Sequence, residues 1–373
     1  MASEVAVVKA DGQGIVGASL IDTDVHPAGP PTYEGLLGYM PETWRLRLRH
    51  LANTPLAGTG SGFRQIHPAL HFDRDDAKPP GGGRAASDPV FLCSDLLDRY
   101  GTTYALLIPL EPAVMGVSIM DPDLASVVVS ACNDYFVEHW LNDRRLRYSI
   151  VVSPLDPLAA AAEIRRLGSN PSVAAVFVPV SAVPLGNARF NPIWEAALEY
   201  GLPVVSHPGA GEGIYFGNTA PFNYPSIDYA EKLTDIQAIA AANLTSLVFR
   251  GTFDRFPELK IVFVEWGFTW AVSHGWHMDS VWRAVRAQNP WVKRWPSEYI
   301  HDNVRFTSQP IPEPHHGGEI EGLIEAHFRD SLFFASDYPH WNGDDPRLVF
   351  KALSGSTRRK LFAENAASIL RLT

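Results

Sequence analysis

Three strand-like apolar runs in this chain end in a His or an Asp, close to a Pro or a Gly that interrupts the run. The runs cover residues 19–26, 203–209 and 332–340, and their polar residues include Asp22, Asp24, His26, His207, Asp337 and His340. In a barrel of parallel strands, the carboxyl ends of all strands meet at one rim, where active sites lie. Imidazoles and carboxylates at such a rim can bind a divalent cation. The pattern therefore indicates a metal-dependent enzyme.

The spacing within the first run supports this interpretation. Asp22, Asp24 and His26 stand at i, i+2 and i+4, so an extended strand directs all three side chains to one face. Two of them can bind one cation as an Asp-x-His pair, and His207 and Asp337 would join it from the fifth and eighth strands. We expect one divalent ion, zinc first and manganese as the alternative, because nitrogen and oxygen ligands suit both.

Taken singly, these residues also have structural interpretations. A His after an apolar run is usually a hydrogen-bonded structural residue, and Asp337 can begin the turn Ser-Asp-Tyr-Pro. His340 can contact a substrate or lie on an exposed loop. The joint occurrence of such residues on three strands favours the metal site.

An alternation of strand-like and helix-like segments must position these residues. Asp156 before Pro157 and Asn191 before Pro192 predict two helix starts. Eight strands that alternate with helices make the α/β fold of a (β/α)₈ TIM barrel, and a doubly wound open sheet is the competing architecture. The expected strands are Leu20–Thr23, Tyr104–Pro109, Tyr148–Ser153, Ala174–Val178, Pro203–His207, Lys260–Glu265, Val304–Ser308 and Leu332–Asp337.

One long segment, residues 27–87, interrupts this alternation. It contains a short helix-like stretch, Glu42–His50, and Gly- and Pro-rich chain that ends in Pro-Pro-Gly-Gly-Gly. A long irregular insertion in a compact domain is usually a functional lid or a disordered segment. Because the insertion follows the first strand, we expect it over the active-site rim of a single barrel domain that spans residues 1–373.

The composition argues against several classes of partner and location. The chain has 373 residues, of which 46% are hydrophobic and 19% charged, as in an ordinary globular fold. Its formal net charge of -10 disfavours nonspecific binding to nucleic acid or to anionic membranes. No apolar stretch is long enough to cross a bilayer, and the first residues lack the layout of a signal peptide. Because Cys93 and Cys132 are the only cysteines, we expect a reduced, cytoplasmic protein without a thiolate zinc site.

Four segments of the chain carry the pattern of a known family. They are residues 189–209, from Arg-Phe-Asn-Pro-Ile-Trp to Ser-His-Pro-Gly, and the segments Phe256–Val262, Ala335–His340 and Glu364–Ala367. Together they resemble the amidohydrolase-2 family of the amidohydrolase superfamily, over nearly the whole chain outside residues 27–87. The resemblance implies a metal-binding (β/α)₈ barrel and a homodimer. This family includes aminocarboxymuconate-semialdehyde, resorcylate and carboxyvanillate decarboxylases.

The resemblance also implies that Asp24, His26, His207 and Asp337 bind the metal, with two departures from the family pattern. Many members have His-x-His where this chain has Asp24-x-His26. On the sixth strand many members have a catalytic His, whereas this chain reads Phe-Val-Glu-Trp-Gly and places Glu265 there. Near the metal, Glu265 would act as a ligand or as an acid/base; away from it, Glu265 would pair with an Arg or stabilise a loop.

These observations predict a non-oxidative decarboxylase that acts on a small aromatic or conjugated carboxylic acid. The cation would chelate the substrate carboxylate, and Asp337 would protonate the ring carbon, with Glu265 and His207 as further catalytic residues. Arg64 and His340 are the candidate substrate-binding residues, because a guanidinium fork matches a carboxylate.

Three other functions are compatible with the same residues. A metal-activated water would make the protein a hydrolase of an amide, lactone or C–C bond, or a hydratase. Glu265 and Asp337 could form the carboxylate pair of a metal-free glycosidase. The altered sixth strand also allows a non-catalytic barrel that only binds a ligand.

Overall fold

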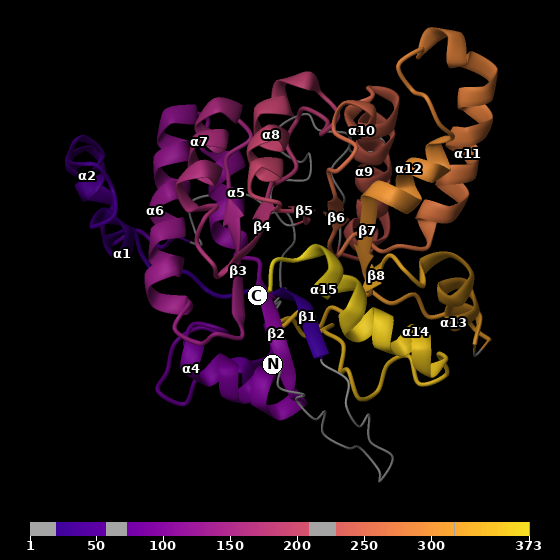
Figure 1. The fold of residues 1–373 in the computed structure, drawn as a ribbon. Helices are drawn as coiled ribbons and strands as arrows, with labels where there is room; N and C mark the ends of the chain where they lie inside the picture. Colours follow the sequence, from indigo (N-terminus) through magenta and orange to yellow (C-terminus); the bar gives the residue numbers. More distant parts are fainter. Residues whose placement is uncertain (1–19, 57–72, 209–228, 317, 373) are drawn as a thin grey trace.

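The computed structural model describes residues 20–56, 73–208, 229–316 and 318–372, which form the expected (β/α)₈ barrel (Figure 1). Eight strands lie side by side in chain order, and each neighbouring pair from β1 to β8 is parallel. All eight predicted strands are confirmed, with shifts at their ends; the largest is in the eighth, which ends at Phe333 and not at the predicted Asp337. They are β1 (Leu20–Val25), β2 (Thr102–Leu107), β3 (Leu146–Val151), β4 (Val173–Phe177), β5 (Val204–Ser206), β6 (Ile261–Phe263), β7 (Val304–Thr307) and β8 (Leu332–Phe333).

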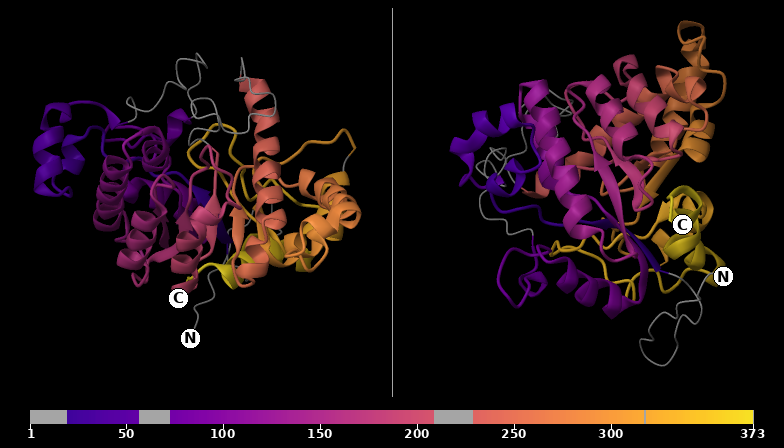
Figure 2. Two further views of the ribbon diagram at one scale, coloured as in Figure 1. Left: turned by 90° about the horizontal axis from the view of Figure 1, so that it is seen from above. Right: turned by 60° about the vertical axis from the view of Figure 1, so that its left-hand side comes forward.

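Helices surround the strands on the outside of the barrel (Figure 1, Figure 2). Turns of π-helix continue α4, α13 and α14 over residues 93–98, 324–328 and 360–364. None of the helices in the described part of the chain is both long and apolar enough to cross a bilayer. The helices are α1 (Glu34–Leu37), α2 (Glu42–Leu48), α4 (Pro89–Leu92), α5 (Leu110–Ser118), α6 (Pro122–Trp140), α7 (Pro157–Leu167), α8 (Asn191–Glu199), α9 (Tyr229–Phe249), α10 (Thr252–Arg255), α11 (Trp270–Val285), α12 (Pro296–Asn303), α13 (Glu319–Leu323), α14 (Gly355–Arg359) and α15 (Asn365–Ile369).

Of the two predicted helix starts, one is confirmed and one is wrong. The side chain of Asp156 accepts hydrogen bonds from two backbone N–H groups at the start of α7, and Pro157 is the first helical residue. Asn191 is not a cap, because α8 already includes it. A 3₁₀ turn over residues 188–190 leads directly into α8, and Asn187 caps that turn instead.

Every residue of β1, β3 and β4 is buried. Helices cover the outer face of such strands, and packed side chains fill the barrel interior. The buried residues of β1 nevertheless include Asp22 and Asp24, and His26 beyond its end is also buried. Because burying a charged group is costly unless it is paired, these three residues require partners.

The insertion between β1 and β2 has two described parts in different positions. Helix α1 packs beside α6, where Leu36 shares a hydrophobic cluster with Val128, and α2 lies farther out, beyond α1 (Figure 1). The second part, residues 73–87, reaches the rim, where Asp73 forms a β-bridge with His340. Of the described insertion, this second part therefore borders the carboxyl ends of the strands.

Candidate metal centre

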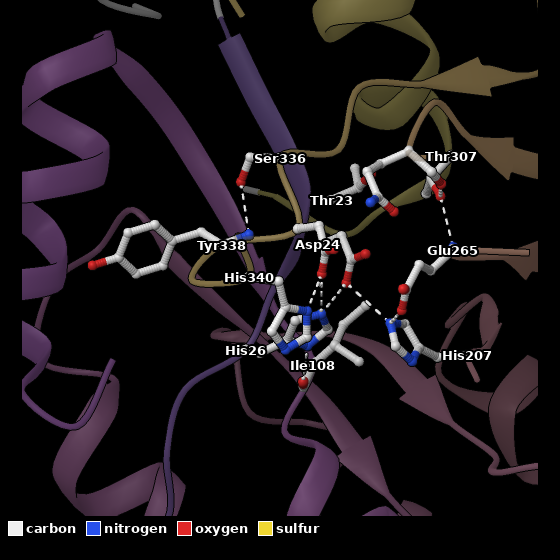
Figure 3. Close-up of polar contacts among 12 residues, drawn as sticks. Thr23, Asp24, His26, Ile108, His207, Glu265, Thr307, Ser336, Tyr338 and His340 are labelled. Carbon is white, nitrogen blue, oxygen red and sulfur yellow. Dashed lines mark hydrogen bonds and ion pairs between the residues drawn. The ribbon is translucent and has the colours of Figure 1, made fainter. Parts of the chain in front are cut away.

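The carboxyl ends of β1, β5 and β8 bring the four predicted ligands together, and Figure 3 shows three of them, Asp24, His26 and His207. His26 Nε2 lies 3.1 Å from Asp24 Oδ1 and 3.1 Å from Asp337 Oδ1. His207 Nε2 lies 3.5 Å from Asp24 Oδ1. All four residues are buried. Asp24, His26 and His207 form one group whose ligand atoms lie within 4.8 Å of one another, and His26, Asp337 and His340 form a second.

The Nδ1 atom of each imidazole determines what its Nε2 can do. His26 Nδ1 lies 2.8 Å from the carbonyl oxygen of Ile108, and His207 Nδ1 contacts the carbonyl oxygen of Pro208. A carbonyl only accepts hydrogen bonds, so Nδ1 carries the proton in both rings. In a neutral ring, Nε2 then presents a lone pair, and here it faces carboxylate oxygens. These atoms repel each other unless a cation lies between them or the ring takes up a second proton.

The donor atoms fit a divalent cation. Metal–ligand bonds of about 2.1 Å at angles of about 90–110° place neighbouring ligand atoms about 3.0–3.4 Å apart. The Nε2–Oδ1 distances here are 3.1–3.5 Å. Both carboxylate oxygens of Asp24, Oδ2 of Asp337 and Nε2 of His207 are buried without a hydrogen-bond partner among the described residues. Since buried polar atoms are normally satisfied, these residues suit a bound metal ion.

Asp337 is paired with His340 as well as with His26. Asp337 Oδ1 lies 2.5 Å from His340 Nδ1, and the His340 and His26 rings stack with centroids 4.7 Å apart. Burial alone would raise the pKa of Asp337, but His340 and His26 hold this pKa below its usual range. Burial would lower the pKa of His340, but the Asp337 carboxylate raises it to about 9. The pair therefore holds one proton between a carboxylate and an imidazole at neutral pH.

Glu265 follows β6 and contacts His207. Its Oε2 lies 3.1 Å from His207 Nε2, and its side chain is 13% exposed. Its backbone has a left-handed φ of 60°, and its N–H donates a hydrogen bond to Thr307 Oγ1 at 3.0 Å (Figure 3). Burial would lower the pKa of His207, but Asp24 and Glu265 raise this pKa well above its ordinary value. Glu265 thus lies at the candidate centre, where its ion-pair partner within the described chain is a His.

Other predicted and unpredicted residues complete the surroundings. Arg64 lies outside the described residues. Asp22 precedes Asp24 by two residues in β1. Its Oδ1 accepts a hydrogen bond from the backbone N–H of Ser336 at 3.0 Å. Burial raises the pKa of Asp22 to about 7. The sequence analysis did not identify Thr307 as a residue of the site, because other strand ends supplied every predicted ligand. Its position at the end of β7 was the signal that could have identified it.

Several solved structures share this fold. An amidohydrolase from Mycobacterium avium subsp. paratuberculosis K-10 has a TM-score of 0.68 at 20% identity, covering 96% of this chain and 100% of that chain. A 5-carboxyvanillate decarboxylase from Sphingomonas paucimobilis has a TM-score of 0.65 at 19% identity, covering 95% of this chain and 100% of that chain. A dihydroxybenzoic acid decarboxylase from Polaromonas sp. JS666, with bound manganese and the inhibitor 2-nitroresorcinol, has a TM-score of 0.62 at 20% identity and covers 94% of this chain and 96% of that chain.

Sequence comparison places the chain in a family. No curated protein matches it. A family model described as amidohydrolase matches residues 96–372, a region that includes β2 to β8 with His207, Glu265 and Asp337. Because this match spans most of the chain and the barrel agrees with it, the protein belongs to the amidohydrolase family.

Proposed function

We propose that this protein is a metal-dependent decarboxylase that releases CO₂ from a small aromatic or conjugated carboxylic acid. The observation that carries this proposal is the buried group of Asp24, His26 and His207, with Asp337 and His340 beside it. The reaction type is supported by the similar structures, which include decarboxylases of 5-carboxyvanillate and of 2,6-dihydroxybenzoate.

The proposed cofactor is one divalent ion held by Asp24, His26, His207 and Asp337. Two neutral imidazoles and two carboxylates balance its charge and leave positions open for a substrate. Carboxylate-containing ligand sets suit manganese as well as zinc. Three of the similar decarboxylase structures contain manganese. Although the sequence favoured zinc, manganese is therefore the first ion to test.

The residues of this chain can supply the proton that the reaction consumes. A bound cation would polarise the substrate carboxylate and a neighbouring oxygen and fix their orientation. His340 Nδ1 holds a proton 2.5 Å from Asp337 Oδ1, and Asp337 would pass this proton to the carbon that bears the carboxylate. A C–H bond forms at this carbon, its bond to the carboxylate breaks, and the electron pair restores the conjugated system as CO₂ leaves. One proton from water then returns through His340.

The roles of three other residues are part of this proposal. His340 would contact the substrate, because its Nδ1 contacts Asp337 Oδ1 at the candidate centre and part of its side chain is exposed. Arg64 is proposed as a partner of a substrate carboxylate. Glu265 would act as an acid/base or would orient His207, since it lies 3.1 Å from the ring nitrogen.

The proposal is tested by measuring CO₂ release from 5-carboxyvanillate and from 2,6-dihydroxybenzoate by the Mn²⁺-loaded protein. We expect Asp337→Asn to reduce kcat by about 10²–10⁴-fold, because it removes the carboxylate that passes the proton from His340 to the substrate. The control is Asp302→Asn, which changes a partly exposed carboxylate on α12. A hydrolysed or hydrated product without CO₂ would overturn the decarboxylase assignment, and activity that survives complete metal removal would overturn the metal-dependent one.

A further inference from the structure

The barrel closes between its first and last strands, β1 and β8, and this boundary is the seam of the barrel. β8 ends at Phe333, and the chain beyond it runs along β1 without regular strand pairing. Two backbone hydrogen bonds cross the seam, from Thr23 N–H to the carbonyl of Phe334 at 3.1 Å and from His26 N–H to the carbonyl of Tyr338 at 2.8 Å. Ser336 lies midway between these two points.

A side chain crosses the seam at Ser336. The backbone N–H of Ser336 donates to Asp22 Oδ1 at 3.0 Å. The same oxygen lies 3.3 Å from the backbone N–H of Asp24, which also donates to it. Asp22 is 1% exposed, so this carboxylate is buried among backbone donors. One buried oxygen therefore holds the backbone of a candidate ligand on β1 and of the residue that precedes Asp337.

The segment after β8 needs this support, because Asp337 has an unfavourable backbone conformation. Its φ is 59°, in the left-handed region that residues other than Gly rarely adopt. Such a conformation persists only where the surrounding contacts determine it. The Thr23 hydroxyl holds the carbonyl of Phe334 at 2.7 Å, and Asp22 holds the N–H of Ser336. Both contacts lie immediately before Asp337 in the chain.

We propose that Asp22 is a positioning residue that sets the distance between Asp337 and the ligands of β1. Asp22 fixes the backbone of Asp24 and of Ser336 together, and these neighbours determine where Asp24 and Asp337 direct their oxygens toward His26. The inference rests on the metal site of the proposed function, but not on its reaction. Removal of the Asp22 carboxylate should therefore weaken metal binding although Asp22 itself binds no metal.

The test measures the Kd for Mn²⁺ of the full chain by competition with a chelator. We expect Asp22→Ala to weaken Mn²⁺ binding about 10–100-fold, as is usual when a residue that orients metal ligands is lost. Asp22→Asn should retain most of the affinity, because its amide oxygen can still accept both backbone hydrogen bonds. The matched control is Asp156→Ala, which also removes an acceptor of two backbone N–H groups, but at the start of α7.

A second measurement separates positioning from a general loss of folding. The EPR spectrum of bound Mn²⁺ in Asp22→Ala should differ from that of the wild type, because the Asp337 ligand is displaced when Ser336 loses its acceptor. The Asp156→Ala spectrum should match the wild type. A wild-type Kd and a wild-type EPR spectrum in Asp22→Ala would overturn the inference. If the wild type binds Mn²⁺ but releases no CO₂, the proposed reaction fails while the Kd comparison still decides the role of Asp22.

Discussion

The strongest test of the candidate centre is the replacement of His207 by Ala. His207 is buried, its Nδ1 is fixed by the carbonyl of Pro208, and its Nε2 supplies one of the four proposed ligand atoms. Four-ligand zinc sites bind their metal with about 10–16 kcal/mol, which is about 2.5–4 kcal/mol for each ligand. At about 1.4 kcal/mol for each factor of ten, His207→Ala should weaken metal binding about 10²–10³-fold.

The assay is a chelator competition with Mn²⁺ and with Zn²⁺, combined with metal analysis after dialysis. The matched control is His274→Ala on α11, because His274 is also partly buried but hydrogen-bonds to Thr245 away from the rim. Its metal affinity should stay within about threefold of the wild type. The reasoning is refuted if His207→Ala keeps stoichiometric metal with an unchanged Kd, or if His274→Ala loses metal to the same extent.

Two further predictions concern residues beside the centre. Thr307→Val removes the acceptor of the Glu265 N–H, which costs about 1–3 kcal/mol, and should lower kcat about tenfold at saturating metal. Thr307→Ser should retain most of the activity, and an equal loss in both variants would contradict this role of the hydroxyl. Burial raises the pKa of Asp344 from 3.8 to about 7, with smaller contributions from Asp337 and Glu313. Because the folded state binds this proton more tightly than the unfolded state, the stability it contributes is lost as pH rises from about 4 to about 7. A pKa difference of this size corresponds to a loss of at most about 4 kcal/mol in the free energy of unfolding. Because Asp344 is partly exposed, we expect a loss of about 2 kcal/mol. In metal-free protein, Asp344→Asn should thus stabilise the fold against urea at about pH 8 and leave it unchanged at about pH 4. An equal gain at both pH values would show that charge burial is not the cause.

The sequence predicted the barrel and the residues at its rim because both leave a strong pattern. A buried strand interrupted by Asp or His carries an energetic cost, so such residues stand out against Val, Ile and Phe. The rim of a parallel barrel then brings β1, β5 and β8 together without any further information. This is why Asp24, His26, His207 and Asp337 could be grouped although 311 residues separate His26 from Asp337.

The contacts that orient these residues could not be predicted. His26 is oriented by the backbone carbonyl of Ile108, and Asp22 by the backbone N–H of Ser336. Backbone groups occur at every position, so no residue type records which of them is the partner. Helix α5 is likewise not evident from the sequence, because it contains Pro112 and Gly116, both weak helix formers. Its packing against α6 compensates for them.

Glu265 and Asp337 share a backbone conformation that links strain to the site. Their φ values are 60° and 59°, and a residue other than Gly in this region costs about 1–3 kcal/mol. Each conformation is supported by a buried side chain, since Thr307 accepts the N–H of Glu265 and Asp22 accepts the N–H of Ser336 before Asp337. The left-handed turn brings each carboxylate against a His, with Glu265 Oε2 3.1 Å from His207 Nε2. It follows that the backbone turn after β6 directs the side chain of residue 265 toward the centre, so a Glu can occupy the place where the family resemblance led us to expect a His.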